Sequence, residues 1–339
     1  LWEYVQNDAF NARNTFAAKT PRVRRNQFGA AIGGPVIKNK VFFFGSFEGT
    51  VIRNQQTWNT QAVTSAMKQG NFSALSKNII DPLAQAPFAG NLIPSNRISG
   101  ASKYYAPMLL EANSPDGQFR TNAGTKNNTW EGMGRVDYQL TDSQRLYGRY
   151  VRVRQPSTLL GYKPESVTND VVNQHNFGLN YTWAMSGNTV LTLTSGLMKT
   201  RETYTNDALG KVNDAEAAGI QGFATTGREK WIGPSNLGFA NGYQGIYFAG
   251  WGAPGALWGD VYNTKADLRH FRGAHTMAVG FEYGNSKVYG DHGSCCSRGN
   301  FNFYNQYTND GFADFLLGYT SGSSRNAPLA EFGTNSAPY

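Results

Sequence analysis

The sequence has little charge for its length and lacks any long apolar run. Charged residues make up 16% of the 339 residues, against about a quarter in an ordinary soluble domain. No stretch of about 18 consecutive apolar residues is present, which excludes a membrane-spanning helix. The mean hydropathy of −0.47 is nevertheless polar. The composition is therefore typical neither of a soluble enzyme nor of a helical membrane protein.

Cysteine is almost absent. The two cysteines, Cys295 and Cys296, are adjacent, and His292 lies nearby. The spacing of zinc motifs is missing. We therefore interpret this stretch as a loop with two thiols or one vicinal disulfide, and we expect neither a metal site nor a cofactor.

Aromatic residues and glycine are abundant: aromatics reach 14% and there are 39 glycines. A closed barrel crosses a membrane with strands that are apolar on only one face, so its mean hydropathy resembles that of a soluble protein. Low charge, many aromatics, many glycines and a polar average together fit such a barrel.

Period-two alternation is clearest between residues 174 and 203. Phe177 and Leu179 alternate with Asn176 and Asn180, as in a strand with one apolar face. Similar hairpins are expected near 26–52, 130–154, 174–203 and 258–289, with tight turns near 37–40, 140–144, 184–188 and 271–274. In the second hairpin the alternation slips after Tyr150, which a bulge or a strand leaving the membrane would explain.

Long segments separate the hairpins, near 53–127, 155–172 and 204–256. Short turns that alternate with long loops are typical of outer-membrane barrels, in which the loops are extracellular. A soluble sandwich or propeller would space its strands more evenly. The sequence predicts an incomplete antiparallel outer-membrane β-barrel of about ten strands, with all four tight turns on one rim.

The two faces of this sheet are predicted from the alternation. The lipid-facing set is Phe177, Leu179, Leu191, Leu193, Leu268, Val279 and Phe281, and the lumen-facing set is Asn176, Asn180, Thr192, Lys265, Asp267 and Glu282. Leu179→Arg is expected to cost about 2–4 kcal/mol of stability, and Asn180→Arg far less.

The net charge of +8 raises the question of nucleic-acid binding. The basic residues are scattered, and no nucleic-acid-binding motif is present. Outer-membrane lipid and lipopolysaccharide, with their phosphates, are simpler partners for exposed Arg and Lys. Catalysis is not expected either, because His175, His270 and His275 fall on apolar strand faces and no nucleophile motif is found.

Several stretches resemble TonB-dependent outer-membrane receptors of the Oar-like kind. They are Leu1–Asp8, Phe10–Asn14, Arg25–Pro35, Lys38–Gly45, Phe47–Gly49, Ile80–Leu83, Pro87–Phe88, Gly90–Asn91, Ile93–Ile98, Arg135–Tyr138, Arg145–Tyr150 and Phe312–Gly318. The resemblance implies a large barrel plugged by an N-terminal domain, and import driven by contact with TonB. Because the chain starts at Leu1 without a signal peptide, we expect a fragment that lacks the plug, the TonB-contacting region and the C-terminal strands.

The resemblance implies a receptor that binds a ligand through extracellular loops and imports it. The ligand would be a peptide, an oligosaccharide or a chelate. Four aromatic residues in the glycine-rich loop are candidate ligand contacts: Trp231, Tyr243, Tyr247 and Trp251. Such rings stack on ligands, but they also pack a loop against itself. A passive adhesin or structural envelope protein built on the same barrel is the alternative function.

Overall fold

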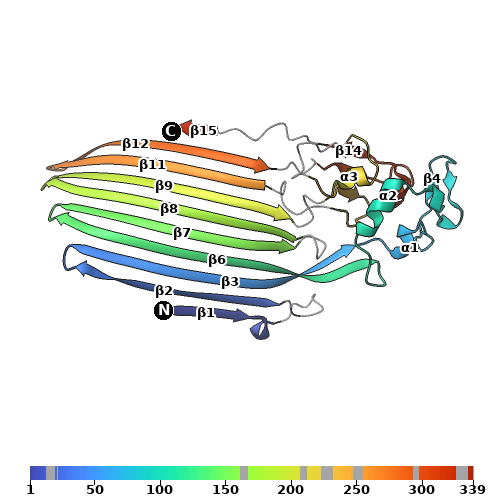
Figure 1. Cartoon of the computed structure of the whole chain (residues 1–339), viewed down its shortest axis with the longest axis horizontal. Helices are drawn as coiled ribbons and strands as arrows, with labels where there is room; N and C mark the ends of the chain where they lie inside the picture. The colour runs from blue at the N-terminus through green and yellow to red at the C-terminus, as the bar shows by residue number, and fades with distance from the viewer. Residues whose placement is uncertain are drawn as a thin grey trace.

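The protein consists of one long antiparallel sheet with a compact cap at one end (Figure 1). The computed structural model describes residues 1–12, 20, 22–160, 167–206, 212–222, 232–246, 255–292, 298–325 and 335–338. We use the term cap for the described parts of residues 62–117, 212–246 and 298–325.

The large sheet contains ten strands. These are β1 (Trp2–Asn7), β2 (Val23–Ile37), β3 (Val41–Gln61), β6 (Gln118–Thr141), β7 (Gln144–Leu160), β8 (Val167–Ser186), β9 (Thr189–Asn206), β11 (Gly255–Arg272), β12 (His275–His292) and β15 (Asn335–Pro338). They lie side by side in chain order and each pairs antiparallel with its neighbour. The predicted antiparallel fold is confirmed. Among the described strands, β1 and β15 form opposite edges of the sheet, which is open.

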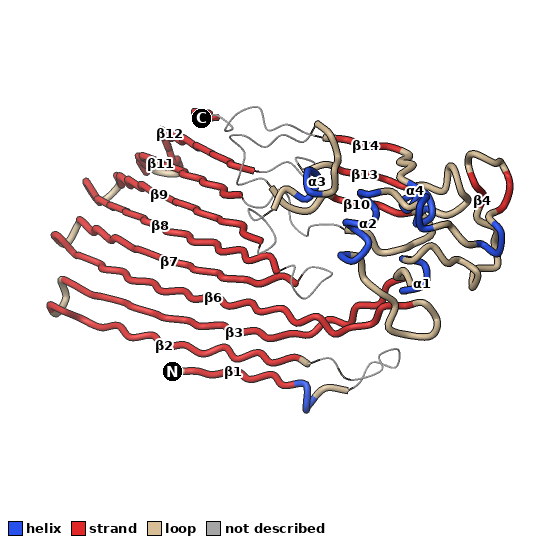
Figure 2. Tube along the Cα trace, turned by 45° about the vertical axis from the view of Figure 1, so that its right-hand side comes forward, coloured by secondary structure: helices blue, strands red, loops and turns tan. Residues whose placement is uncertain are grey.

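The four tight turns lie together at the end of the sheet opposite the cap (Figure 2). They join β2 to β3, β6 to β7, β8 to β9 and β11 to β12. Two of them use a left-handed backbone, at Asn39 (φ 58°) and Gly273 (φ 59°), as tight hairpins require. The prediction that all four turns share one rim is confirmed.

The strands run further into the expected loops than the sequence predicted. β3 continues to Gln61 and β6 begins at Gln118, so their connection is 62–117 rather than 53–127. Likewise only 161–166, outside the described residues, separates β7 from β8. The pattern missed these extensions because their apolar residues do not alternate regularly: Trp58 and Phe119 are isolated, and Val171 and Val172 are adjacent. Backbone pairing needs no apolar alternation.

The cap contains short helices and strands. Its elements are α1 (Ser65–Lys68), β4 (Ile80–Asp81), β5 (Ala86–Pro87), η2 (Ala89–Asn91), η3 (Ser95–Arg97), α2 (Gly100–Tyr105), η4 (Ala106–Met108), α3 (Asp214–Ala217), β10 (Asn236–Phe239), β13 (Asn300–Phe303), α4 (Gly311–Leu317) and β14 (Gly322–Ser324). One further short helix, η1 (Asp8–Phe10), follows β1. β10, β13 and β14 form a three-stranded sheet that joins two of the long connections.

The hydrophobic core of the described chain lies in the cap. Phe72, Tyr105, Leu237, Phe312 and Leu316 are each 2% exposed or less and belong to one cluster. They come from all three long connections. None of the described helices combines the length and the apolar composition that spanning a membrane requires.

Candidate functional site

The strand register divides the sheet into two chemically different faces. Residues paired across antiparallel strands share a face, and each strand alternates between faces. The register places all seven predicted lipid-facing residues on one side, which we call the apolar face. It places all six predicted lumen-facing residues on the other, which we call the polar face.

The apolar face exposes large hydrophobic side chains. Leu179 is 52% exposed, Val279 66% and Phe281 68%. We use the term row for the residues that are paired with one another across successive strands. Four adjacent rows on this face, from the row of Phe177 to the row of Trp183, carry no charged residue between β2 and β12. Such a continuous exposed apolar surface is stable in lipid and not in water.

Tyrosine and tryptophan lie on this face both near the tight turns and toward the cap, there two rows beyond the row of Phe177. Tyr181 and Trp183 are near the tight turns, and Trp130, Trp258 and Tyr289 share one row toward the cap. Ten residues of β8 separate the two borders, about 33 Å along the strand at ~3.3 Å per residue. A strand tilt of about 40° reduces this to roughly 25 Å, the height of the apolar band in membrane barrels.

The polar face is held by ionic and hydrogen-bonded pairs. The Arg135 guanidinium donates to Asp137 from Nε (2.7 Å) and Nη2 (2.6 Å) and lies 3.9 Å from the centre of the Tyr147 ring. Asn263 donates to Glu282 at 2.7 Å. These pairs suit a wet lumen, because exposed ion pairs need water to solvate their remaining atoms.

Arg149 lies flat along the polar face because its neighbour has no side chain. A Cβ added to Gly178 would come 3.1 Å from Nε and 3.2 Å from Cγ of Arg149. A hollow of about 360 Å³ opens beside this arginine and is bordered by Tyr147, Asn176 and Asn263. The hollow presents a cation and amides, groups that interact with a polar or anionic surface.

The alternation slip after Tyr150 is not a bulge. Pairing of β7 with β6 and with β8 is regular from Leu146 to Arg154. Val151 and Val153 therefore lie on the polar face, whereas Arg152 and Arg154 lie on the apolar face. Of the two explanations, the strand leaving the hydrocarbon layer is the one that fits.

Two of the three histidines on apolar strand faces, His175 and His270, have structural partners. Nδ1 of His175 is 2.7 Å from the Tyr150 hydroxyl, and the two rings stack. Nδ1 of His270 is 2.9 Å from the Thr189 hydroxyl oxygen. These pairs lie on the apolar face at strand positions, and within the described residues no group of His, Cys, Asp and Glu could hold a metal ion.

The helix α4 organises the cap. Asp310 caps its N-terminus by accepting from the amides of Phe312 (2.9 Å) and Ala313 (3.0 Å). Oδ2 of the same carboxylate, which is fully buried, forms an ion pair with Lys77 Nζ at 2.8 Å. Gly318 ends the helix in the left-handed conformation, with φ 82°.

The buried carboxyl of Asp314 ties α4 to the loop before it. It accepts from the Thr308 amide (2.8 Å) and the Thr308 hydroxyl (2.6 Å). Burial raises the pKa of Asp314 above its ordinary value, although these hydrogen bonds act in the opposite direction. Burial also raises the pKa of Tyr105 to about 12.

Hydrogen bonds join the three long connections across the cap. The Ser99 amide donates to the Leu316 carbonyl (2.8 Å), and the hydroxyls of Tyr105 and Ser235 are 2.9 Å apart. Tyr104 donates to Asp214 at 2.7 Å. The cap is therefore a single folded body made of segments that lie far apart in the sequence.

The structure describes one of the four predicted ligand contacts, Tyr243. It is 8% exposed, packs beside Phe312, and its hydroxyl donates to Asp310 at 3.3 Å. Tyr243 thus belongs to the cap core. Trp231, Tyr247 and Trp251 lie outside the described residues, as do Cys295 and Cys296, and a ligand role for the three aromatics stays a prediction.

The cap core was missed at the sequence level, although one signal for it was present. Phe312, Phe315 and Leu316 have helical i, i+3, i+4 spacing. Asp310 before them and Gly318 after them are ordinary helix-capping residues. Which other segments this helix would contact could not be read from its own pattern.

Comparison with known proteins identifies the class. Residues 1–339 match the family described as Outer membrane beta barrel domain, and the chain belongs to this family. It is a protein of the outer membrane. The family and fold indicate a role other than catalysis.

Among solved structures, the chain is similar to the outer membrane transporter YddB from Escherichia coli. The sequences are 9% identical and the TM-score is 0.44; the match covers 84% of this chain and 28% of the transporter. No curated protein matches the sequence.

Proposed function

We propose that this chain is part of a TonB-dependent outer-membrane receptor, which binds a ligand at its extracellular surface and imports it through a plugged barrel. The observation that carries the proposal is the single folded cap on the side of the long connections, above a charged polar face. In this reading the long connections are extracellular and the polar face lines the lumen. Contact with TonB would be made by a region outside residues 1–339.

The chemistry of the described residues supports passage of a polar ligand. The polar face offers both signs of charge, with Arg149 beside the hollow and Asp267 near Lys265. The cap places its own ionisable groups in fixed positions, as with Arg97 and Asp81, whose side chains form a bidentate pair. Import of this kind needs positioned binding groups and no catalytic residue.

Uptake by whole cells tests the proposal. Cells carrying or lacking the gene for the full-length protein would receive labelled ferric citrate, a maltodextrin mixture or a tryptic peptide digest. We expect one probe to accumulate only when both this protein and TonB are present. Accumulation that depends on the gene but not on TonB would contradict active transport.

Two cap variants sharpen the test. Asp310→Ala removes the buried cap of α4, whereas Asp116→Ala removes a carboxylate half exposed at the surface beside Arg120. If the cap positions the ligand, uptake falls in the first variant and not in the second, at equal surface abundance. The passive adhesin is favoured instead if no probe accumulates and loss of the gene reduces surface attachment.

A further inference from the structure

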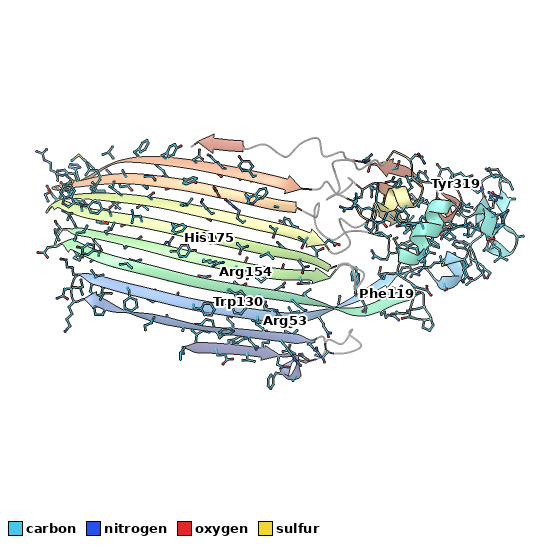
Figure 3. All side chains as sticks on the ribbon, viewed as in Figure 1. Arg53, Phe119, Trp130, Arg154, His175 and Tyr319 are labelled. Carbon is cyan, nitrogen blue, oxygen red and sulfur yellow. The ribbon has the colours of Figure 1, made fainter. Side chains whose placement is uncertain are left out.

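Two adjacent cross-strand rows on the apolar face, at the border toward the cap, carry five cations. Arg152, Lys199 and Lys287 lie in one row, and Arg154 and Arg201 lie in the next. We call these two rows the basic rows. They run over β7, β8, β9, β11 and β12, and Figure 3 places Trp130, Arg154 and His175 beside one another on neighbouring strands.

The position of the basic rows along the strands indicates at which depth of the membrane they lie. The four rows between them and the tight turns carry no charge on this face. Trp130, Trp258 and Tyr289 share the row of Arg154, at the level where amphipathic rings meet lipid headgroups. The cations therefore lie in the aromatic row that ends the apolar band and in the row just inside it, on the side of the long connections.

Carboxylates on these strands neutralise little of this charge. In the basic rows of the five strands the one carboxylate is Asp260, which accepts from Arg201 at 2.6 Å. Arg152, Arg154 and Lys287 are exposed. Within the described residues none of these three, nor Lys199, forms an ion pair. Asp260 also lies between Lys199 and Lys287 in its row. Five cations against one carboxylate leave the basic rows with an excess of positive charge that an anion from the surroundings can neutralise.

The width of the basic rows indicates an anion with several charges on one molecule. The rows extend over four strand spacings, about 19 Å at ~4.8 Å each. A single phosphate bridges two or three neighbouring cations, whereas a phosphorylated disaccharide with several acyl chains reaches across more strands. Outer-membrane barrels have their long connections on the extracellular side. In that orientation the leaflet that meets the rows is the outer one, which contains lipopolysaccharide.

We propose that the basic rows bind the phosphates of a lipopolysaccharide molecule whose acyl chains lie on the charge-free rows below. The site stands apart from ligand import, although it rests on the same orientation of the long connections as the proposed function. Its ligand is a phosphorylated glycolipid, held by Arg and Lys from β7, β9 and β12.

The test is a binding titration with the full-length protein in non-ionic detergent and fluorescently labelled lipopolysaccharide as the probe. The variant R152Q/R154Q/K199Q removes three cations from the basic rows. The matched control R145Q/R149Q/K265Q removes three cations from the polar face of the same sheet. With attraction of the usual size per basic residue, we expect the first variant to weaken binding at least about tenfold and the control less than about twofold.

Competition separates the sources of phosphate. Unlabelled lipopolysaccharide should displace the probe, and dephosphorylated lipopolysaccharide should not. Equal weakening in the two triple variants, or displacement by the dephosphorylated form, overturns the proposal. So does equally strong displacement by phosphatidylglycerol micelles, which would assign the rows to phospholipid. If the first triple variant does not fold, R154Q/K287Q repeats the measurement with two exposed cations removed.

Discussion

The sheet and the cap contain similar apolar residues in opposite surroundings. Phe281 on the sheet is 68% exposed, whereas Phe312 in the cap is fully buried. The cap buries its apolar side chains as a water-soluble domain does, while the sheet leaves them on a continuous surface. The difference indicates that the two regions fold in different solvents: the cap in water, and the apolar face of the sheet in hydrocarbon.

The largest expected effect is in the cap. Phe312→Ala should destabilise the cap by about 3–5 kcal/mol, because the cavity left in a packed core is filled only in part. Phe281→Ala, its counterpart on the apolar face, should cost far less, since lipid chains fill the space. Hydrogen exchange of the α4 amides in the lipid-reconstituted full-length protein would measure the first effect. Similar costs at both positions would remove the distinction between the two regions.

The next effect is on the sheet itself. Leu179→Arg should lower the free energy of unfolding by about 2–4 kcal/mol, since the charge enters hydrocarbon. Asn180→Arg, one residue further on β8, faces the polar side and should cost much less. Denaturant titration of both variants in lipid vesicles gives the contrast. Equal penalties would mean that neither face meets lipid.

The smallest effect is a pH dependence confined to the cap. Burial raises the pKa of Asp314 in the folded cap above its ordinary value of 3.8. The group therefore contributes stability that is complete below pH 3.8 and is lost as pH rises through the raised folded pKa. Asp314→Asn should flatten this part of the pH profile of the cap, followed by thermal unfolding between pH 3.5 and 7. An unchanged profile would rule out this carboxyl as its source.

The faces of the sheet could be predicted from the sequence and the core of the cap could not, for a physical reason. Strand alternation is a local pattern, so Phe177 and Asn176 could be assigned to opposite faces from their neighbours alone. The contact between Ser99 and Leu316, by contrast, joins residues more than 200 positions apart, and no periodicity encodes it. Tyr243 shows the consequence: its ring looked available to a ligand, and only the tertiary contacts with Phe312 and Asp310 place it in a core.

The hydrogen bonds across the cap limit how the long connections move. Three separate loops would each swing independently about their own strand ends. Here the connection after β3 is tied to the one after β12 by Ser99 and Leu316, and to the one after β9 by Tyr105 and Ser235. A displacement of one connection must carry the others with it or break a shared core. The cap is therefore expected to move as one body. It has fewer independent motions than three separate loops of the same length would have.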